Sequence, residues 1–367
     1  MKITCIKVYK IALPLKEGSY KWSHNSEIKE FDNTIIKIET DSEFFGYGEV
    51  CTLGSAYLPA YARGVRTGIK EIGKSLIGLD PTNIQEINNV MDKNLKGHPY
   101  VKSPIDMACW DLLGNTYKMP VWKLLGGKFG EAIDLYRAIS QEDPLLMSEK
   151  VKQYKQEGYS KFQLKVGGNP FEDIQRIIQV RSILDPSDIL VADANTGWLM
   201  HDALKVIKET EHLDIYYEQP CMTYKECLII RKKTKNPFIL DESIDSIDSF
   251  LNAINDGAMD AINIKISKIG GITKSKLLRD LCVEMQIPMT IEDSWGGDIA
   301  TAAIAHLAHS TPEKYRFSST DFNNYNSVTY TSGSPQKKNG QMQASDNFGL
   351  GIKVNEGLLG LPVLEIN

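Results

Sequence analysis

The sequence has no long apolar segment, no paired cysteine motif and no excess of basic residues. No stretch approaches the roughly 20 apolar residues of a membrane span, so we expect no membrane partner. The opening MKITCIKVYKIALPL alternates like a strand and lacks the apolar region and cleavage site of a signal peptide. The six cysteines show no CxxC spacing, which argues against a disulfide framework or a zinc site. These absences predict a cytoplasmic protein with reduced thiols.

Acidic residues outnumber basic ones, 47 to 42, which gives a net charge of −5. The chain therefore offers no basic face of the kind that nucleic acid needs. Its 367 residues, 42% of them hydrophobic, suffice for a smaller domain and one barrel of about 200–250 residues. We expect a small-molecule substrate, no nucleic-acid partner and a homo-oligomer.

Three regions follow one another along the chain. Strand alternation in residues 1–50 and amphipathic helices in residues 60–125 predict an α+β capping domain over residues 1–125. Ser103 followed by Pro104 is typical of the start of the last of these helices. Strand and helix patterns then alternate through residues 126–322, which predicts a βα-barrel. Residues 323–367 are expected to return to the capping domain, because they end in two strand-like runs.

Charged residues recur at a nearly constant interval within the predicted barrel. They lie 23–28 residues apart, about one strand and one helix, and each closes a short apolar run: Lys165, Asp193, Glu218, Asp241, Lys265 and Asp293. The C-terminal ends of barrel strands meet on one face, where βα-barrel enzymes hold their active sites. The interval therefore predicts one charged site at that face.

The three carboxylates Asp193, Glu218 and Asp241 come from consecutive predicted strands. Three hard oxygen ligands without a nearby His or Cys predict Mg²⁺, with Mn²⁺ as the other choice. The alternative, that each acid caps a helix or pairs with a surface lysine, does not explain their common register. Outer partners orient metal ligands, and the candidates for that role are Gln163, Asn195, Glu242 and Asp293.

Lys165 and Lys265 belong to the second and sixth predicted strands, on opposite sides of the predicted metal. A lysine is a weak base at its solution pKa of about 10.4, but burial and a nearby cation favour the neutral amine. Two lysines on opposite faces of one carbon allow one to remove a proton and the other to return it. Mg²⁺ would stabilise the enediolate that forms when a carboxylate substrate loses its α-proton. The alternative is a pair of solvated lysines at strand ends.

Asp293 and Trp295 are two residues apart on the seventh predicted strand, so we expect them on one face. A carboxylate can pair with an ammonium group, and an indole face attracts a cation. Phe322 is a candidate second aromatic wall. This pattern predicts a small carboxylate substrate with a cationic nitrogen. The alternative is that Trp295 packs beneath a loop.

Five motifs carry a resemblance to a known family: QLK ending at Lys165, DAN from Asp193, EQP from Glu218, DES from Asp241 and KISKIGG from Lys265. On these motifs the chain resembles the enolase superfamily, and within it the muconate lactonizing enzyme-like group. The resemblance implies a modified (β/α)7β TIM-type barrel with an α+β cap, the three carboxylates on Mg²⁺, and the two lysines as acid and base. It also implies that the loops around Ser19–Ile28 and Thr52–Tyr61 close over the substrate, which makes Tyr57 a candidate contact.

The chain departs from the group's pattern at two places. Gln163 stands where the group usually has a lysine, which removes a positive charge beside Lys165. The seventh strand, MTIEDSWGG, carries no histidine, which argues against the mandelate racemase-like subgroup.

The segments GHPYVKSPIDMACWDLLG, EQPC and EDSWGGDIA are similar to those of hydroxyproline-betaine 2-epimerases. The resemblance favours racemisation or epimerisation of a proline-like amino acid or its betaine by a two-lysine mechanism. A cis-3-hydroxy-L-proline dehydratase shares the first proton abstraction and is the first alternative. Further alternatives are a cycloisomerase or another amino-acid racemase of the group, and a metabolite-binding barrel without catalysis.

Overall fold

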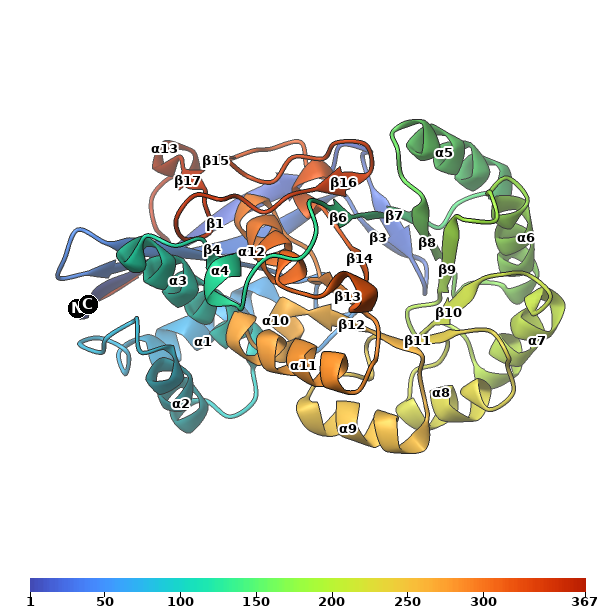
Figure 1. The fold of residues 1–367 in the computed structure, drawn as a ribbon, viewed down its shortest axis with the longest axis horizontal. Coiled ribbons are helices and arrows are strands. Elements are labelled where there is room, and N and C mark those ends of the chain that lie inside the picture. Colours follow the sequence, from blue (N-terminus) through green and yellow to red (C-terminus); the bar gives the residue numbers. More distant parts are fainter.

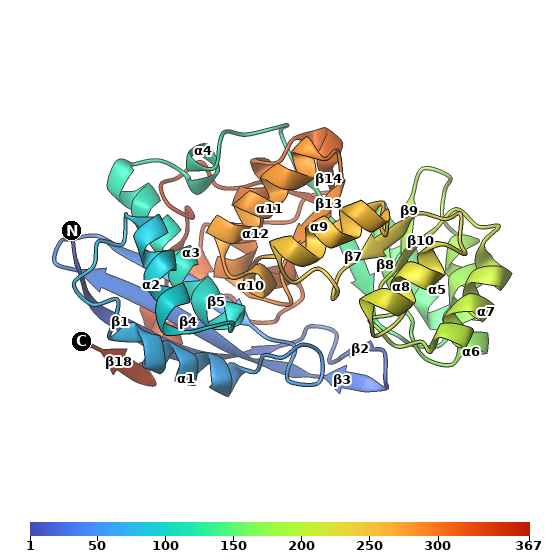
Figure 2. The ribbon, with the colours of Figure 1, turned by 90° about the horizontal axis from the view of Figure 1, so that it is seen from below.

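The computed structural model describes residues 1–367 as a sheet-and-helix cap joined to a barrel (Figure 1). Both chain termini lie close together at the end of the molecule formed by the cap (Figures 1 and 2). The green and yellow helices surround the other end (Figure 2). No helix is both long enough and apolar enough to cross a membrane.

The cap is built on a four-stranded antiparallel sheet in the order β18-β1-β4-β5. Its strands are β1 (Ile3–Pro14), β4 (Glu30–Thr40), β5 (Phe45–Cys51) and β18 (Leu364–Ile366). Three helices accompany it: α1 (Ala62–Gly73), α2 (Ile84–Asn94) and α3 (Pro99–Tyr117). A Cβ atom on Gly48 of β5 would stand 1.8 Å from the carbonyl oxygen of Pro104 in α3. The glycine therefore allows α3 to lie directly on the sheet.

The barrel consists of eight parallel strands with a helical segment between each pair. The strands are β7 (Tyr136–Ile139), β8 (Lys161–Lys165), β9 (Ile189–Asp193), β10 (Tyr216–Glu218), β11 (Phe238–Leu240), β12 (Ala261–Lys265), β13 (Met289–Glu292) and β14 (Arg316–Ser319). The helices are α5 (Pro144–Gln156), α6 (Pro170–Arg181), α7 (Met200–Thr210), α8 (Tyr224–Arg231), α9 (Ile247–Asp256), α10 (Ile266–Ile269), α11 (Ile272–Glu284) and α12 (Asp298–His309). A parallel bridge between Leu135, directly before β7, and Ser319 of β14 closes the barrel. The predicted (β/α)7β barrel with an α+β cap is confirmed.

Short elements complete the chain. They are β2 (Tyr20–Trp22), β3 (Ser26–Ile28), α4 (Val121–Leu124), β6 (Ile133–Asp134), η1 (Glu313–Tyr315), η2 (Phe322–Asn324), β15 (Thr331–Ser332), β16 (Gln341–Met342), β17 (Lys353–Val354) and α13 (Glu356–Leu359).

Strand alternation divides the barrel interior into an apolar N-terminal half and a charged C-terminal half. Val191, Ile239 and Ala261 form a small apolar cluster that is separate from the main core. Two residues further along β9 stands Asp193, and two residues after Ile239 stands Asp241. Because residues i and i+2 share a face of a strand, the apolar side chains fill the N-terminal half of the interior. The charged ones therefore collect at the C-terminal end.

Helix α3 begins earlier than its sequence signal predicts. It starts at Pro99, with Pro104 inside the helix and Ser103 buried. The Ser103 hydroxyl donates to the Ser267 hydroxyl at 3.3 Å, so it makes a tertiary contact and does not cap the helix. Proline is tolerated in the first turn, and here Pro99 takes that position. The prediction of a helix start at Ser103 is therefore wrong.

Asp106 of α3 joins the cap to the barrel. It is fully buried, and its carboxylate accepts from Thr273 N at 2.9 Å, at the start of α11, from Thr273 Oγ1 at 2.5 Å and from Asn88 Nδ2 at 2.7 Å. Gly271 has φ +119°, and a Cβ there would stand 2.5 Å from Asp106 Oδ2. The loop before α11 thus needs glycine for this close approach.

We expect Asp106→Ala to lower the free energy of unfolding by about 3 kcal/mol, because it leaves several buried donors without a partner. Urea denaturation followed by circular dichroism measures this. Asp106→Asn, which keeps acceptor capacity, should cost less. The exposed Asp214→Ala is the control and should change stability little. Equal stability of Asp106→Ala and the native chain would contradict the bridging role.

Candidate active site

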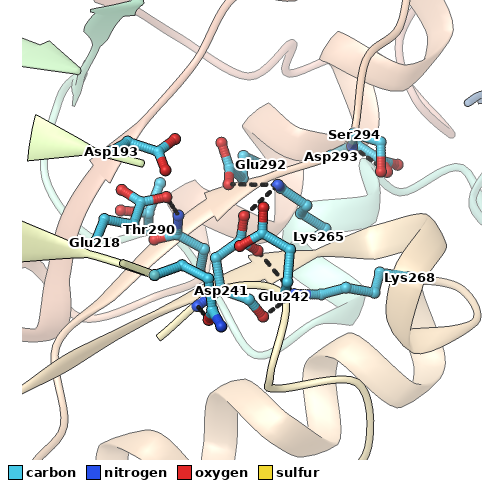
Figure 3. A network of polar contacts seen from close by, with 12 residues as sticks. Asp193, Glu218, Asp241, Glu242, Lys265, Lys268, Thr290, Glu292, Asp293 and Ser294 are labelled. Atoms are coloured by element: carbon cyan, nitrogen blue, oxygen red, sulfur yellow. Dashed lines mark hydrogen bonds and ion pairs between the residues drawn. The ribbon is translucent and has the colours of Figure 1, made fainter. Parts of the chain in front are cut away.

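The C-terminal ends of the barrel strands bring the charged residues to one face (Figure 3). Lys165, Asp193, Glu218 and Lys265 are the last residues of β8, β9, β10 and β12, and Asp241 directly follows β11. In the strand register, Asp193 stands beside Lys165 on one side and Glu218 on the other. Lysines from the second and sixth of eight strands lie across the barrel from each other.

Each of the three carboxylates has a different set of partners. Lys165 Nζ lies 2.5 Å from Asp193 Oδ2, and Lys265 Nζ forms an ion pair with Asp241 Oδ2. A further lysine, Lys268, donates to Asp241 Oδ1 at 2.8 Å. Sequence reasoning assigned it no role, although its motif KISKIGG contains it three residues after Lys265.

Glu218 is bound by amides and by no ammonium group. Asn263 Nδ2 donates to it at 2.7 Å and Gln163 Nε2 at 3.1 Å. Gln163 therefore donates its hydrogen bonds to a carboxylate. Burial, and then the charges of Asp193 and Asp241, raise the pKa of Glu218 well above its usual range.

These carboxylates fit a hard divalent cation by their chemistry. All three are buried, all donors are oxygens, and the Glu218 carboxylate lacks a positive partner, which is costly inside a protein. Two further buried oxygens of neighbouring residues, Asn195 Oδ1 and Glu242 Oε2, have no hydrogen-bond partner. No three His, Cys, Asp or Glu side chains are arranged around one point so as to hold a metal ion, because Asp193 and Asp241 are turned toward lysines.

The lysines are held in their charged form by these carboxylates. Burial lowers the pKa of Lys165, but Asp193, Tyr20 and Glu218 together outweigh burial, and the pKa lies above its usual range. Lys265 behaves in the same way beside Asp241. The sequence-based expectation of lowered lysine pKa values assumed a nearby cation as well as burial, so it stays a prediction for the metal-bound site. The protein groups by themselves favour the charged lysines, because each lysine meets a buried carboxylate directly.

Asn195 and Glu242 form a pair next to the carboxylates. Asn195 Nδ2 donates to Glu242 Oε1 at 2.9 Å, and the Asn195 backbone N–H donates to Asp193 Oδ1 at 2.9 Å. Burial, and then the charge of Asp241, raise the pKa of Glu242 to about 7. The pair thus connects the ends of β9 and β11, as an orienting role requires.

A small cavity, partly open to solvent, lies at this end of the barrel. Both lysines line it, and the capping domain contributes Tyr20, Trp22, Leu53 and Tyr57. The Tyr57 hydroxyl lies 2.5 Å from Lys265 Nζ and 3.1 Å from Asp241 Oδ2. The two predicted loops therefore supply walls of the cavity, and Tyr57 contacts both kinds of charged group.

Asp293 and Trp295 both line the cavity, so their role as a cation site stays a prediction, but protein groups already contact both of them. Strand β13 ends at Glu292, so the strand alternation that predicted a common face does not extend to them. Asp293 accepts from Ser267 Oγ at 2.7 Å and from Ser294 N at 2.7 Å, and burial raises its pKa to about 7. Both of its oxygens are therefore occupied by hydrogen bonds.

Trp295 is only 2% exposed. Its ring stacks on Phe31 at 4.5 Å between centroids and lies 4.8 Å from Phe322. Its Nε1 donates to Asn326 Oδ1 at 3.1 Å. Trp295 thus belongs to an aromatic cluster, and Phe322 supports it from the barrel side.

Sequence reasoning missed Glu292. It ends β13, beside Lys265 in the register, and its Oε2 accepts from the Tyr136 hydroxyl. The signal was present in MTIED, because Thr290 and Glu292 alternate with Met289 and Ile291. This alternation places Glu292 in the barrel interior, whereas the spacing argument selected its neighbour.

Comparison with known proteins gives the family. Residues 23–126 match the mandelate racemase / muconate lactonizing enzyme N-terminal domain, and residues 146–358 match the enolase C-terminal domain-like family. The chain therefore belongs to the enolase superfamily of enzymes.

Three relatives bear on its activity. A cis-3-hydroxy-L-proline dehydratase of Roseibium aggregatum is 56% identical over 363 residues, 99% of each chain. An N-succinyl-L-Arg/Lys racemase of Bacillus cereus is 31% identical over 367 residues, 98% of this chain and 97% of the relative. A crystal structure of an enolase-superfamily member from Roseovarius nubinhibens ISM, complexed with magnesium, matches with a TM-score of 0.94. It is 34% identical, and the match covers 100% of this chain and 99% of that one.

The predicted resemblance to the enolase superfamily is confirmed, and the family supports proton abstraction as the first chemical step. Epimerisation as the main activity is not confirmed. The relative that is 56% identical is a lyase, whereas the 31% identical relative is a racemase. The dehydratase alternative is the better supported one.

Proposed function

We propose that this protein is a Mg²⁺-dependent dehydratase of cis-3-hydroxy-L-proline. The observation that carries the proposal is the 56% identity to such an enzyme over 99% of both chains. A cavity lined by two lysines from opposite strands supports it independently. The substrate is a small carboxylate with a ring nitrogen, as the sequence predicted.

The stereochemistry of the substrate suits two opposed lysines. Its carboxylate and 3-hydroxyl lie on the same face of the ring, so the α-proton and the hydroxyl lie on opposite faces. One lysine takes the α-proton, and the other gives a proton to the departing hydroxide. The C2–H and C3–O bonds break, a C2=C3 double bond forms, and water leaves. The resulting enamine tautomerises to a cyclic imine, pyrroline-2-carboxylate.

Asp193, Glu218 and Asp241 would hold the metal. Mg²⁺ bound there would supply positive charge that stabilises negative charge on the substrate carboxylate and offsets the attraction of the carboxylates for the lysines. The Tyr57 hydroxyl, hydrogen-bonded to Lys265, orients that ammonium group toward the cavity. The buried aromatic cluster around Trp295 excludes water from one wall.

Epimerisation is the second candidate. The racemase relative and the same two lysines favour it, because removal of the α-proton is the common first step. The two reactions diverge in what the second lysine protonates: the α-carbon in epimerisation and the hydroxide in dehydration.

We expect the protein with Mg²⁺ to convert cis-3-hydroxy-L-proline to the cyclic imine, followed by ¹H NMR. Trans-3-hydroxy-L-proline is the matched control and should react far more slowly, because its α-proton and hydroxyl share a face. Proline betaine and hydroxyproline betaine should show no change in optical rotation. Inversion of the betaines with cis-3-hydroxy-L-proline left intact would replace dehydration by epimerisation.

A further inference from the structure

Glu292 is a buried carboxylate in the cavity, and one of its oxygens accepts no hydrogen bond. The residue is 2% exposed and lines the cavity with Lys165 and Lys265. Its Oε2 accepts from the Tyr136 hydroxyl of β7, the next strand but one in the closed barrel. Its Oε1 has no hydrogen-bond partner and lies 3.8 Å from Lys265 Nζ (Figure 3). A buried acceptor without a donor is costly, so this oxygen is poised for a donor from a ligand.

The other acid of the cavity wall already accepts several hydrogen bonds. Asp293, the neighbour in sequence, accepts from the N–H and hydroxyl of Ser267 and from Ser294 N. Figure 3 shows it beside Ser294, apart from the group that contains Glu292 and Lys265. Glu292 is therefore the carboxylate available to a cationic ligand.

We propose that Glu292, held by Tyr136, binds the ring ammonium group of the substrate, an inference that rests on the proposed proline-like substrate. Lys265 and Glu292 are partners in the register of β12 and β13. The nitrogen of an α-amino acid is one bond from the α-carbon, so an ammonium on Glu292 brings the α-carbon beside Lys265. Glu292 thus positions the carbon at which the proton is lost.

This arrangement selects for a nitrogen that carries hydrogen. A secondary ammonium donates an N–H to Oε1, whereas the quaternary nitrogen of a betaine has none to donate. The site therefore favours free cyclic amino acids over their betaines.

The test measures binding by calorimetry with Mg²⁺ present and uses ligands that cannot lose water. L-Proline is compared with tetrahydrofuran-2-carboxylate, whose ring oxygen replaces the ammonium group, and with proline betaine. The native protein should bind L-proline more tightly than either. Glu292→Gln should weaken L-proline binding about 10- to 100-fold, the range for a lost charge-assisted hydrogen bond, and leave tetrahydrofuran-2-carboxylate nearly unchanged. Tyr136→Phe should weaken L-proline binding less.

Glu284→Gln, an equivalent change at an exposed site on α11, is the control and should bind all three ligands like the native chain. Thermal melting verifies that each variant is folded, and Glu292→Asp, which withdraws the carboxylate by one methylene, should also lose the preference. Undiminished preference for L-proline in Glu292→Gln, or no preference in the native protein, overturns the inference. If L-proline binding depends on Glu292 but cis-3-hydroxy-L-proline is not dehydrated, the proposed reaction fails and the ammonium site stands.

Discussion

Replacement of Lys165 or Lys265 by alanine is expected to slow dehydration of cis-3-hydroxy-L-proline by about 10²–10⁴-fold, the usual loss for a positioned acid or base. The two lysines end strands on opposite sides of the barrel and line one cavity. In an elimination across two faces, neither can take over the other's proton transfer. Steady-state rates from the NMR assay measure the loss.

The two variants should differ in deuterium exchange. The lysine that removes the α-proton can also return a solvent deuteron to the same face, so the variant that keeps it should still exchange the α-proton in D₂O. The other variant should neither exchange nor dehydrate. Lys208→Ala, at an exposed site on α7, is the control and should behave like the native protein.

Each alanine variant also leaves a buried carboxylate without its ammonium partner, which destabilises a protein. Melting curves with Mg²⁺ present therefore accompany the rates. Dehydration at near-native rate in either folded variant would refute the two-lysine mechanism.

The barrel was predictable because its repeat is long and regular. Lys165, Asp193 and Glu218 each end a short apolar run, and those runs form strands β8, β9 and β10. The parallel register follows from the strand-helix-strand connection, so residues at equivalent positions of the repeat must meet at one end. The spacing of these residues in the sequence was therefore sufficient to predict that their side chains meet at one end of the barrel.

The spacing could not predict side-chain positions that depend on knowing where a strand ends to within one residue. Strand β13 ends at Glu292, and a shift of one residue moves a side chain to the other face. The interval argument selected Asp293, whose carboxylate is bound by Ser267 and Ser294. Element boundaries depend on local caps and contacts that periodicity does not contain. The early start of α3 at Pro99 has the same origin.

Contacts between distant segments do not follow from periodicity, and Tyr57 was a candidate only because of the family resemblance. Tyr57 contacts Lys265 from the capping domain, and Tyr136 contacts Glu292 from β7, the next strand but one in the closed barrel. No periodic pattern indicates which of many tyrosines reaches the site. The sequence could not distinguish epimerisation from dehydration, because both reactions begin with the same proton abstraction by the same lysines.

Removal of divalent metal is expected to abolish turnover, and Mg²⁺ should restore it. Asp193, Glu218 and Asp241 provide only oxygen donors, which suits Mg²⁺. A ligand that binds only the folded state raises its stability by about 2.7 kcal/mol at 100 times its dissociation constant. Mg²⁺ should therefore raise the melting temperature of the chelator-treated native protein. Full turnover in metal-free protein would refute the metal requirement.

Glu218→Gln tests the metal site most directly. No ammonium group contacts Glu218, which accepts only from Asn263 and Gln163, whereas changes at Asp193 or Asp241 would also break an ion pair with a lysine. The variant should lose turnover and most of the Mg²⁺-dependent rise in melting temperature while remaining folded. Glu209→Gln, at an exposed site on α7, should keep both. Loss of one of three carboxylate ligands must weaken Mg²⁺ binding. If calorimetry shows that Glu218→Gln binds Mg²⁺ as tightly as the native protein does, Glu218 is not a ligand.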